Sequence, residues 1–293
     1  MSAGTKLPIT VLLAARNEEV NIRKCLATLG PVERIIVIDS FSKDRTATIA
    51  TELGAEVVQF TYTGGYPKKR QWVLDTVPIH TDWVLLLDAD EEVPPQLWEE
   101  ITAAIADPNA PNGFLIVKGF HFLGRRFRFG GFSFAAMLLV RNGKARFERL
   151  VEDVASGQDM EVHERVIVDG PVGRFATPIT HDDFKGLEAY LDRHNKYSTW
   201  EAKLRDRFLT TGYYGESTIQ PRLFGNAQER RRFLKKVAIR MPGESLLWFV
   251  YHYIVRLGFL EGRAGLIASR IRSDYSAGVR AKMYELRQKR GGK

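Results

Sequence analysis

Four acids occupy five positions at the end of an apolar run, in the stretch "WVLLLDADEEV" of residues 83–93. Asp88 and Asp90 lie one residue apart, and like charges at this distance repel each other unless a cation binds between them. Mg²⁺ and Mn²⁺ prefer oxygen ligands and often take only one or two carboxylates together with substrate phosphates. A diphosphate held in this way is a better leaving group, because the metal neutralises the charge that develops on it. The pair therefore predicts a metal–diphosphate site; the alternative is a solvated strand-to-helix turn.

The first 113 residues alternate between expected strands and expected helices. Short apolar runs rich in branched residues predict buried strands at residues 8–15, 34–39, 55–60 and 82–88. Helices are expected at residues 18–29, 45–53, 68–77 and 94–106. Asn17 is expected to cap the first of these helices. Strands that alternate with helices predict a parallel, doubly wound α/β sheet.

The pattern changes after about Gly113. The runs "GFLIVKG" and "AAMLLVRNGKARF" predict strands, and Asn142-Gly143 is a strong two-residue hairpin signal. An amphipathic helix is expected from about Phe184 to Leu204. The polar stretch of residues 205–220 is a candidate linker.

Polar residues follow three of the predicted parallel strands. Arg16 and Asn17 come after the first strand, Asp39 ends the second, and Asp88 ends the fourth. Ligands of open parallel sheets bind outside the carboxyl ends of the strands, so these side chains are expected at one crevice. Asp39 can accept a hydrogen bond from a pyrimidine imide, and a cation from residues 68–70 can offset phosphate charge. The alternative for that basic cluster is a solvated first helical turn, although cations there oppose the helix dipole.

The chain resembles the family 2 glycosyltransferases, which are inverting enzymes of the GT-A fold that use nucleotide-diphosphate sugars. The resemblance rests on "LLAARNEEVNIRKCL", "VIDSFSKDRTATIA", "GGYPKKRQWVL", "LLLDADEEV" and "VHERVIVDG", and covers roughly residues 7–204. The segment "YLDRHNKYSTWEA" and the basic tail are similar to the bacterial subgroup of lipopolysaccharide-core glucosyltransferases. The resemblance implies a mostly parallel central sheet flanked by helices, with a C-terminal helical extension. It divides the chain into a nucleotide-sugar-binding half (1–113), an acceptor and catalytic half (114–204) and a basic amphipathic extension (205–293).

The family motifs also imply roles for individual residues. Asp39 is expected to accept a hydrogen bond from the base, and Lys69 or Arg70 to lie near the nucleotide. The complete set implied to bind the nucleotide sugar is Ala15, Arg16, Asn17, Glu18, Asp39, Lys69, Arg70, Asp88, Ala89 and Asp90. Asp88, Ala89 and Asp90 form the DXD motif, which would hold Mg²⁺ or Mn²⁺.

An inverting transfer needs one carboxylate that takes the proton from the acceptor hydroxyl. Asp153, Asp159 and Glu164 compete for this role. We choose Glu164, because the related subgroup carries its acid in the "VHERV" segment, and keep Asp153 as the second choice. "HERVI" does not match the zinc-protease motif H-E-x-x-H, because its fifth residue is Ile167. His181 is a candidate third metal ligand or phosphate donor, and the alternative is a structural histidine.

The net charge of +8 is concentrated at the C-terminal end. Residues 221–293 contain seventeen Lys and Arg against five Asp and Glu, a net charge of +12. Interleaved cations and aromatic residues predict helices that lie on an anionic membrane surface. A helical cap or dimer interface is the alternative, and no nucleic-acid-binding motif is present. The single cysteine, Cys25, fits a reducing compartment, and the N-terminal apolar run is interpreted as a strand rather than a signal sequence.

Together these features predict an inverting, metal-dependent hexosyltransferase. It would transfer a sugar from a nucleotide diphosphate, expected to be UDP, to a glycan or lipid-linked glycan in lipopolysaccharide or other cell-envelope polysaccharide synthesis. The expected location is cytoplasmic and peripheral, at the inner face of the cell membrane. Two alternatives remain: a nucleotidyltransferase of similar fold, which should show a glycine- and lysine-rich loop after the first strand, and a non-catalytic membrane-binding protein.

Overall fold

The computed structural model describes residues 6–149, 165–182, 186–211, 221–224, 227–241 and 243–291. The chain forms two compact units. The sheet unit consists of Met1–Arg126 and Ser133–Phe184, and the helical unit consists of Phe127–Phe132 and Lys185–Lys293. The predicted boundaries at residues 113 and 204 stay predictions.

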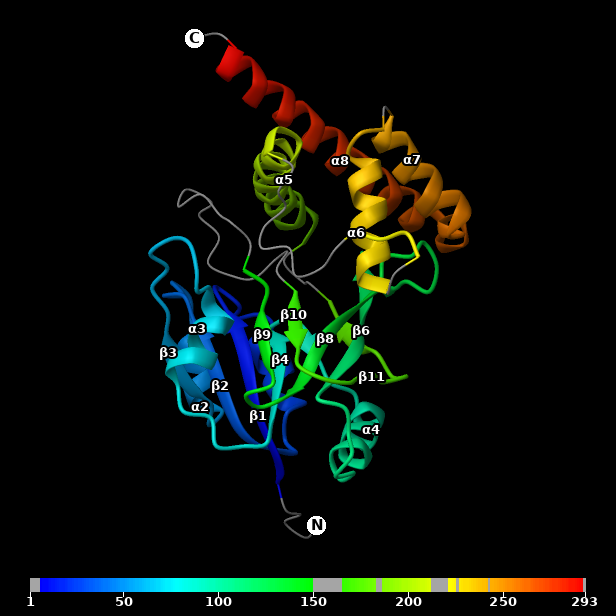
Figure 1. Cartoon of the computed structure of the whole chain (residues 1–293). Coiled ribbons are helices and arrows are strands. Elements are labelled where there is room, and N and C mark those ends of the chain that lie inside the picture. Colours follow the sequence, from blue (N-terminus) through cyan, green and yellow to red (C-terminus); the bar gives the residue numbers. More distant parts are fainter. Residues whose placement is uncertain are drawn as a thin grey trace. The chain divides into compact units, whose positions relative to one another are not determined.

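In its described residues, the sheet unit contains a large mixed sheet and four helices (Figure 1). Its strands are β1 (Leu7–Ala15), β2 (Val32–Asp39), β3 (Glu56–Gln59), β4 (Trp83–Asp88), β5 (Glu91–Glu92), β6 (Gly113–Phe122), β7 (Arg125–Arg126), β8 (Phe134–Arg141), β9 (Ala145–Phe147), β10 (Val166–Val168), β11 (Val172–Arg174) and β12 (Ile179–His181). Its helices are α1 (Ile22–Ala27), α2 (Thr46–Glu52), α3 (Lys69–Thr76) and α4 (Pro95–Ile105).

The main sheet has the strand order β3-β2-β1-β4-β8-β6-β12-β5. The first four strands in this order are parallel, as predicted from the alternating first part of the chain. Beyond β4 the sheet is mixed, because β8 runs antiparallel to both β4 and β6 while β12 is parallel to β6. The predicted fold class, α/β with a C-terminal helical extension, is confirmed.

Apolar residues of β1 alternate between the two faces of the sheet, which fixes the layers. Val11 and Leu13 belong to the core cluster that also contains buried residues of α1, α2 and α4. Leu12 points to the opposite cluster, which contains Val73 of α3 and Phe147 of β9. All three β1 residues have no exposed surface, as expected for a central parallel strand.

The first helix begins later than the sequence predicts. Asn17 adopts a left-handed backbone with φ of 55°, and Asn21 is the residue that precedes the helix. Asn17 is therefore not the helix cap. Its carbonyl Oδ1 instead accepts a hydrogen bond from the backbone N–H of Lys43 at 2.8 Å, so the side chain joins two loops.

The Asn142-Gly143 turn forms, but the two strands beside it do not pair with each other among the described residues. Gly143 has a positive φ of 73° and Lys144 N–H donates to Arg141 O, closing the turn. β9 then pairs with β10 in a separate two-stranded sheet, whereas β8 stays between β4 and β6. The hairpin prediction is wrong in its pairing, because β8 already has a strand on each side.

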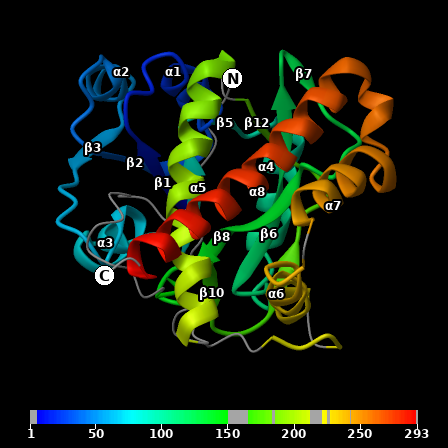
Figure 2. The same cartoon turned by 90° about the horizontal axis from the view of Figure 1, so that it is seen from above.

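The helical unit consists of α5 (Gly186–Thr211), α6 (Ala227–Ala238), α7 (Glu244–Val250), a π-helical turn η2 (Tyr251–Val255), a 3₁₀ turn η3 (Gly258–Glu261) and α8 (Gly262–Gly291). α5 continues beyond the predicted end at Leu204 and includes part of the expected linker. Figure 2 shows α5 and α8 crossing. Ala202 of α5 packs there against Val279 and Met283 of α8. Buried Arg205 also forms an ion pair with Glu244, at 2.8 Å between Nη1 and Oε2.

Two glycines of α8 are expected to respond in opposite directions to alanine. A Cβ on Gly265 would contact the carbonyl oxygen of Gly258 and lie 2.8 Å from Cβ of Glu261. We expect Gly265→Ala to destabilise the helical unit by about 1–3 kcal/mol, because the neighbouring atom is backbone and cannot move freely. Gly278→Ala is the control: its nearest neighbour is Ser198 Oγ at 3.9 Å. This change should stabilise the helix by about 0.5–1 kcal/mol. Urea unfolding followed by circular dichroism measures both, and equal shifts would contradict the packing argument.

None of the helices in the described part of the chain combines the length and hydropathy needed to span a bilayer.

Candidate functional site

Three neighbouring parallel strands end together at the acidic motif. Ala15 of β1 pairs with Asp39 of β2, and Ala14 pairs with Asp88 of β4. The structure therefore brings Asp39 and Asp88 to the same edge of the sheet, one on each side of β1. This is the edge at which open parallel sheets bind ligands.

The loops that follow β1 and β2 are joined by hydrogen bonds. Asn17 N–H donates to Ser42 Oγ at 2.9 Å, and Glu18 N–H donates to Thr46 Oγ1 at 2.7 Å. Arg16 is exposed in the first of these loops, and Ala15 is buried at its start. These bonds hold the predicted nucleotide-binding residues of the first loop against the second loop.

Asp39 is 1% exposed, and its carboxylate already accepts hydrogen bonds from protein groups. Oδ2 accepts from Ser42 N–H and from Gln59 Nε2, both at 3.0 Å, and Oδ1 accepts from Ser42 Oγ. Asp39 thus fixes the turn after β2. Its predicted hydrogen bond to a base stays a prediction.

The basic residues at the start of α3 point toward the strand ends rather than into solvent. Lys69 is 1% exposed, and its Nζ donates to Ala15 O at 2.9 Å. Arg70 Nη2 donates to Leu87 O at 3.0 Å and forms an ion pair with Asp88 Oδ1. The alternative of a solvated helical turn is wrong, because burial and these contacts tie both cations to the ends of β1 and β4.

Asp88 lies in a buried ion cluster that includes residues the sequence analysis did not select. Lys118 Nζ of β6 is 2.8 Å from Asp88 Oδ2 and 2.5 Å from Glu91 Oε1. Glu91 Oε2 also accepts a hydrogen bond from Asp88 N–H at 2.9 Å. Glu91 has no exposed surface, so this member of the acidic stretch does not lie in a solvated turn. The sequence does contain a signal for this buried, paired cation, because Lys118 is the single charged residue in the apolar run "GFLIVKGF".

The charges in this cluster fix its protonation. Burial opposes ionisation of Asp88, but Arg70 and Lys118 outweigh it and hold the pKa of that carboxyl well below its usual range. Burial lowers the pKa of Lys118, and the carboxylates of Asp88 and Glu91 raise it above its ordinary value. Burial raises the pKa of Glu91 despite the attraction of Lys118. Asp88 and Lys118 therefore form a stable ion pair at neutral pH.

Asp90 is paired with His181, although they are 91 positions apart in the sequence. β12 runs antiparallel to β5, and His181 lies opposite Glu91 in that ladder. His181 Nε2 is 3.3 Å from Asp90 Oδ2. Burial disfavours the charged imidazole, but the charge of Asp90 raises the pKa of His181 to about 9. Conversely, burial raises and His181 lowers the pKa of Asp90, with a net decrease.

The residues around Asp90 fit a divalent cation. Asp90 Oδ1 is buried and has no hydrogen-bond partner among the described residues. Such an oxygen is costly to leave without a partner and is a good ligand for Mg²⁺ or Mn²⁺. The described residues contain no group of three or more His, Cys, Asp or Glu arranged to hold a metal. Two protein ligands, Asp90 and His181, would leave positions for substrate phosphates and water, as is usual for Mg²⁺. Asp88 as a direct ligand stays a prediction, because Arg70 and Lys118 contact both of its oxygens.

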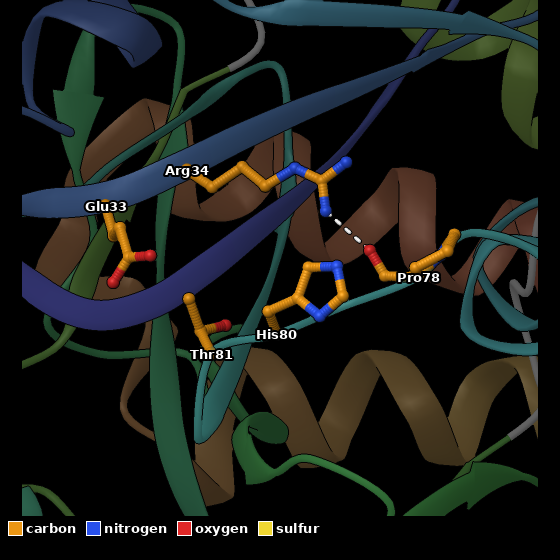
Figure 3. A pocket seen from close by; sticks show the side chains of 5 residues that line it. All are labelled: Glu33, Arg34, Pro78, His80 and Thr81. Atoms are coloured by element: carbon orange, nitrogen blue, oxygen red, sulfur yellow. Dashed lines mark hydrogen bonds between the residues drawn. The ribbon is translucent and has the colours of Figure 1, made fainter.

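A pocket of ≈ 290 Å³ lies at the other edge of the sheet (Figure 3). Glu33 and Arg34 line it from the start of β2, and Pro78, His80 and Thr81 line it from the segment before β4. Arg34 Nη1 donates to Pro78 O at 2.6 Å across it. Its position at the amino ends of the strands separates it from the acidic cluster, so we assign it no part in the site.

The candidate catalytic bases Glu164, Asp153 and Asp159 lie outside the described residues. The described chain resumes at Arg165, whose carbonyl accepts a hydrogen bond from Glu148 N–H at 2.7 Å. The choice between these acids stays a prediction. Ala89, the middle residue of the acidic motif, is buried as a small residue in that turn.

The mixed α/β sheet and the acidic motif at its parallel strand ends define a protein of the GT-A class. Residues 10–132 match the family model described as glycosyl transferase family 2. The match begins within β1 and includes β2 to β4 and the whole acidic motif.

Individual relatives match over parts of their length. A TPR repeat-containing protein of Synechococcus elongatus is 32% identical over 103 residues, which are 35% of this chain and 25% of that protein. The lipopolysaccharide core biosynthesis glycosyltransferase LpsC of Rhizobium meliloti is 26% identical over 203 residues, which cover 67% of this chain and 71% of LpsC. Glucosyl-3-phosphoglycerate synthase of Mycobacterium tuberculosis, solved with Mn²⁺, UDP and glucosyl-3-phosphoglycerate, has a TM-score of 0.32 and 26% identity, and covers 42% of this chain and 46% of that one.

Proposed function

We propose that this protein is an inverting, metal-dependent hexosyltransferase that transfers a sugar from a nucleotide diphosphate, UDP in the first instance, to a glycan or lipid-linked glycan acceptor. The observation that carries the proposal is the meeting of Asp39 and Asp88 at one sheet edge, within the residues that match family 2 glycosyltransferases. The similarity to LpsC supports an acceptor in lipopolysaccharide-core or related envelope polysaccharide synthesis.

Each part of the site has a distinct role in this proposal. Asp39 and the loop of residues 16–18 bind the base and ribose. Asp90 would hold Mg²⁺ or Mn²⁺, with His181 as a further ligand once the metal has displaced its proton. The bound metal would neutralise the charge that develops on the leaving diphosphate. Arg70 and Lys118 orient Asp88 and keep it ionised. Glu164, with Asp153 as the second choice, takes the proton from the acceptor hydroxyl as it attacks the anomeric carbon.

The proposed location is the cytoplasmic face of the cell membrane, with the protein bound peripherally to anionic lipid. The excess of seventeen Lys and Arg over five Asp and Glu in residues 221–293 supports this part of the proposal. A nucleotidyltransferase is less compatible with the sequence, because the loop after β1, "RNEEVN", contains no glycine to hold a triphosphate.

The transfer reaction tests the proposal and separates the two candidate bases. We expect a panel of nucleotide sugars with Mn²⁺ to identify a UDP-sugar that raises the thermal midpoint of the protein and is consumed when acceptor glycan is present. Glu164→Gln should reduce turnover by at least about 100-fold, since general acid–base catalysis contributes about 10²- to 10⁴-fold, while donor affinity is unchanged.

Asp153→Asn is the matched control for the base. Full turnover in Glu164→Gln together with loss in Asp153→Asn would move the base to Asp153. No binding and no consumption of any donor by the wild-type protein would reject the glycosyltransferase proposal and favour a non-catalytic membrane-binding protein.

A further inference from the structure

The exposed side chains of α7, η2 and η3 are almost all apolar. Every exposed residue of the described segment 243–263 is aliphatic or aromatic, apart from two glycines and the arginines Arg256 and Arg263. Leu246 and Val255 are 64% and 63% exposed. We call the exposed aliphatic residues the apolar shelf; they are Leu246, Leu247, Val250, Ile254, Val255, Leu257 and Leu260.

The ionisable acids and the histidine of this segment are turned inward. Glu244 is 2% exposed and forms ion pairs with Arg205 and Arg280. Glu261 Oε1 accepts hydrogen bonds from the backbone N–H groups of Arg128 and Phe129, at 2.6 and 2.8 Å. Buried His252 lies with its Nδ1 2.6 Å from Gly130 O. The segment is therefore held in place by its polar side chains, and it presents no exposed acid.

We propose that the apolar shelf is the membrane-binding surface of this protein and inserts into the headgroup–acyl boundary of an anionic bilayer. An exposed apolar surface of this kind marks an interaction site in a soluble protein. Arg256 and Arg263 lie in the same segment and supply the attraction to anionic headgroups. This inference rests on the membrane association in the proposed function and names the surface that makes it.

The charge of the surroundings favours a bilayer over a second copy of the chain. A symmetric self-contact through the shelf would bring Arg256 and Arg263 of each copy toward the same residues of the other, because such contacts use one patch twice. Residues 221–293 carry seventeen cations against five acids, so two copies would also add their excess positive charge. An anionic lipid surface has the opposite charge and removes this repulsion.

The aromatic residues of the segment divide into partly buried and exposed ones. Trp248 and Tyr253 are only partly exposed and contact neighbouring rings: Trp248 stacks on His252 at 5.5 Å between centroids, and Tyr253 meets Phe259 edge-on at 6.3 Å. Trp248 and Tyr253 thus support the fold of the segment, whereas Tyr251 and Phe259, which are 40% and 44% exposed, add to the exposed apolar surface beside the shelf.

Vesicle co-sedimentation of the full-length chain tests the proposal. The probes are vesicles of phosphatidylcholine alone and of phosphatidylcholine mixed with phosphatidylglycerol. We expect Leu246→Ser/Val255→Ser to weaken binding to mixed vesicles by about 100-fold or more, since each fully inserted apolar side chain contributes about tenfold or more. The control Leu53→Ser/Val172→Ser changes two exposed apolar residues of the sheet unit, 42% and 46% exposed, and should bind like wild type. Arg256→Gln/Arg263→Gln should lose about fivefold per cation on mixed vesicles only.

Three results would overturn the proposal: no binding of wild type to mixed vesicles, equal binding of the two serine pairs, or a wild-type dimer that becomes monomeric in Leu246→Ser/Val255→Ser without any vesicle binding. Circular dichroism and the thermal midpoint check that both serine pairs are folded. Binding of UDP with Mn²⁺, measured in solution without vesicles, tests the proposed nucleotide-sugar site independently of membrane binding. Vesicle binding that depends on the shelf in a protein that binds no nucleotide would support the shelf and reject the glycosyltransferase.

Discussion

Asp90→Ala should abolish the Mn²⁺-dependent part of UDP binding, with a loss of affinity of more than about 100-fold. Asp90 Oδ1 is a buried oxygen without a hydrogen-bond partner in the described chain, and Oδ2 contacts His181. Loss of groups that only support a metal ligand already costs about 10- to 100-fold in metal affinity, so loss of the ligand itself costs more. Titration calorimetry of UDP, with Mn²⁺ and then with a chelator, separates the metal-dependent part from the remainder.

The control for this experiment is Asp82→Ala, which removes an exposed aspartate just before β4, the strand that Asp88 ends. It should bind UDP and Mn²⁺ like wild type. A second variant, His181→Ala, should weaken Mn²⁺-dependent binding less than Asp90→Ala, because the carboxylate remains. If Asp90→Ala and wild type bind UDP equally well with Mn²⁺ present, the assignment of the metal site to Asp90 is wrong.

The parallel half of the fold could be predicted because its signals are local. The branched apolar run before Asp88 forms β4, and the run before Asp39 forms β2, each within a residue or two of the expected bounds. A strand that alternates with helices almost always joins a parallel sheet, so the meeting of these two strand ends followed from the pattern. The meeting of Asp39 and Asp88 at one edge needed no information beyond this.

The rest of the acidic cluster depends on pairing between distant segments, which sequence periodicity does not encode. Lys118 lies on β6, which is separated from the strand of Asp88 by β8 in the sheet order. His181 contacts Asp90 because β12 pairs with the two-residue strand β5. Neither β5 nor β12 is long enough to show a hydrophobic pattern. The pairing of β9 with β10 instead of β8 was missed for the same reason: the turn signal at Asn142-Gly143 specifies the turn but not the partner strand.

Lys118→Met should be among the most destabilising single changes in the sheet unit, with a loss of about 3 kcal/mol or more in the free energy of unfolding. Lys118 is 7% exposed, and its ammonium lies between Asp88 and Glu91. Methionine is similar in size, so little packing is lost and the effect comes from charge. Removing one member of a buried ion pair leaves the other charge without compensation, which costs about 3–5 kcal/mol. Arg70 still contacts Asp88, so the group left without a partner cation is Glu91, which has no exposed surface.

A double variant identifies the cause of this loss. Lys118→Met/Glu91→Gln removes the uncompensated carboxylate and should be more stable than Lys118→Met alone, because an amide is far cheaper to bury than an unpaired charge. Lys144→Met, at an exposed lysine after β8, is the control and should change stability by less than about 0.5 kcal/mol. Urea unfolding with hydrogen exchange of β4 and β6 measures all four proteins. A double variant no more stable than Lys118→Met would show that the uncompensated charge of Glu91 is not the cause of the loss.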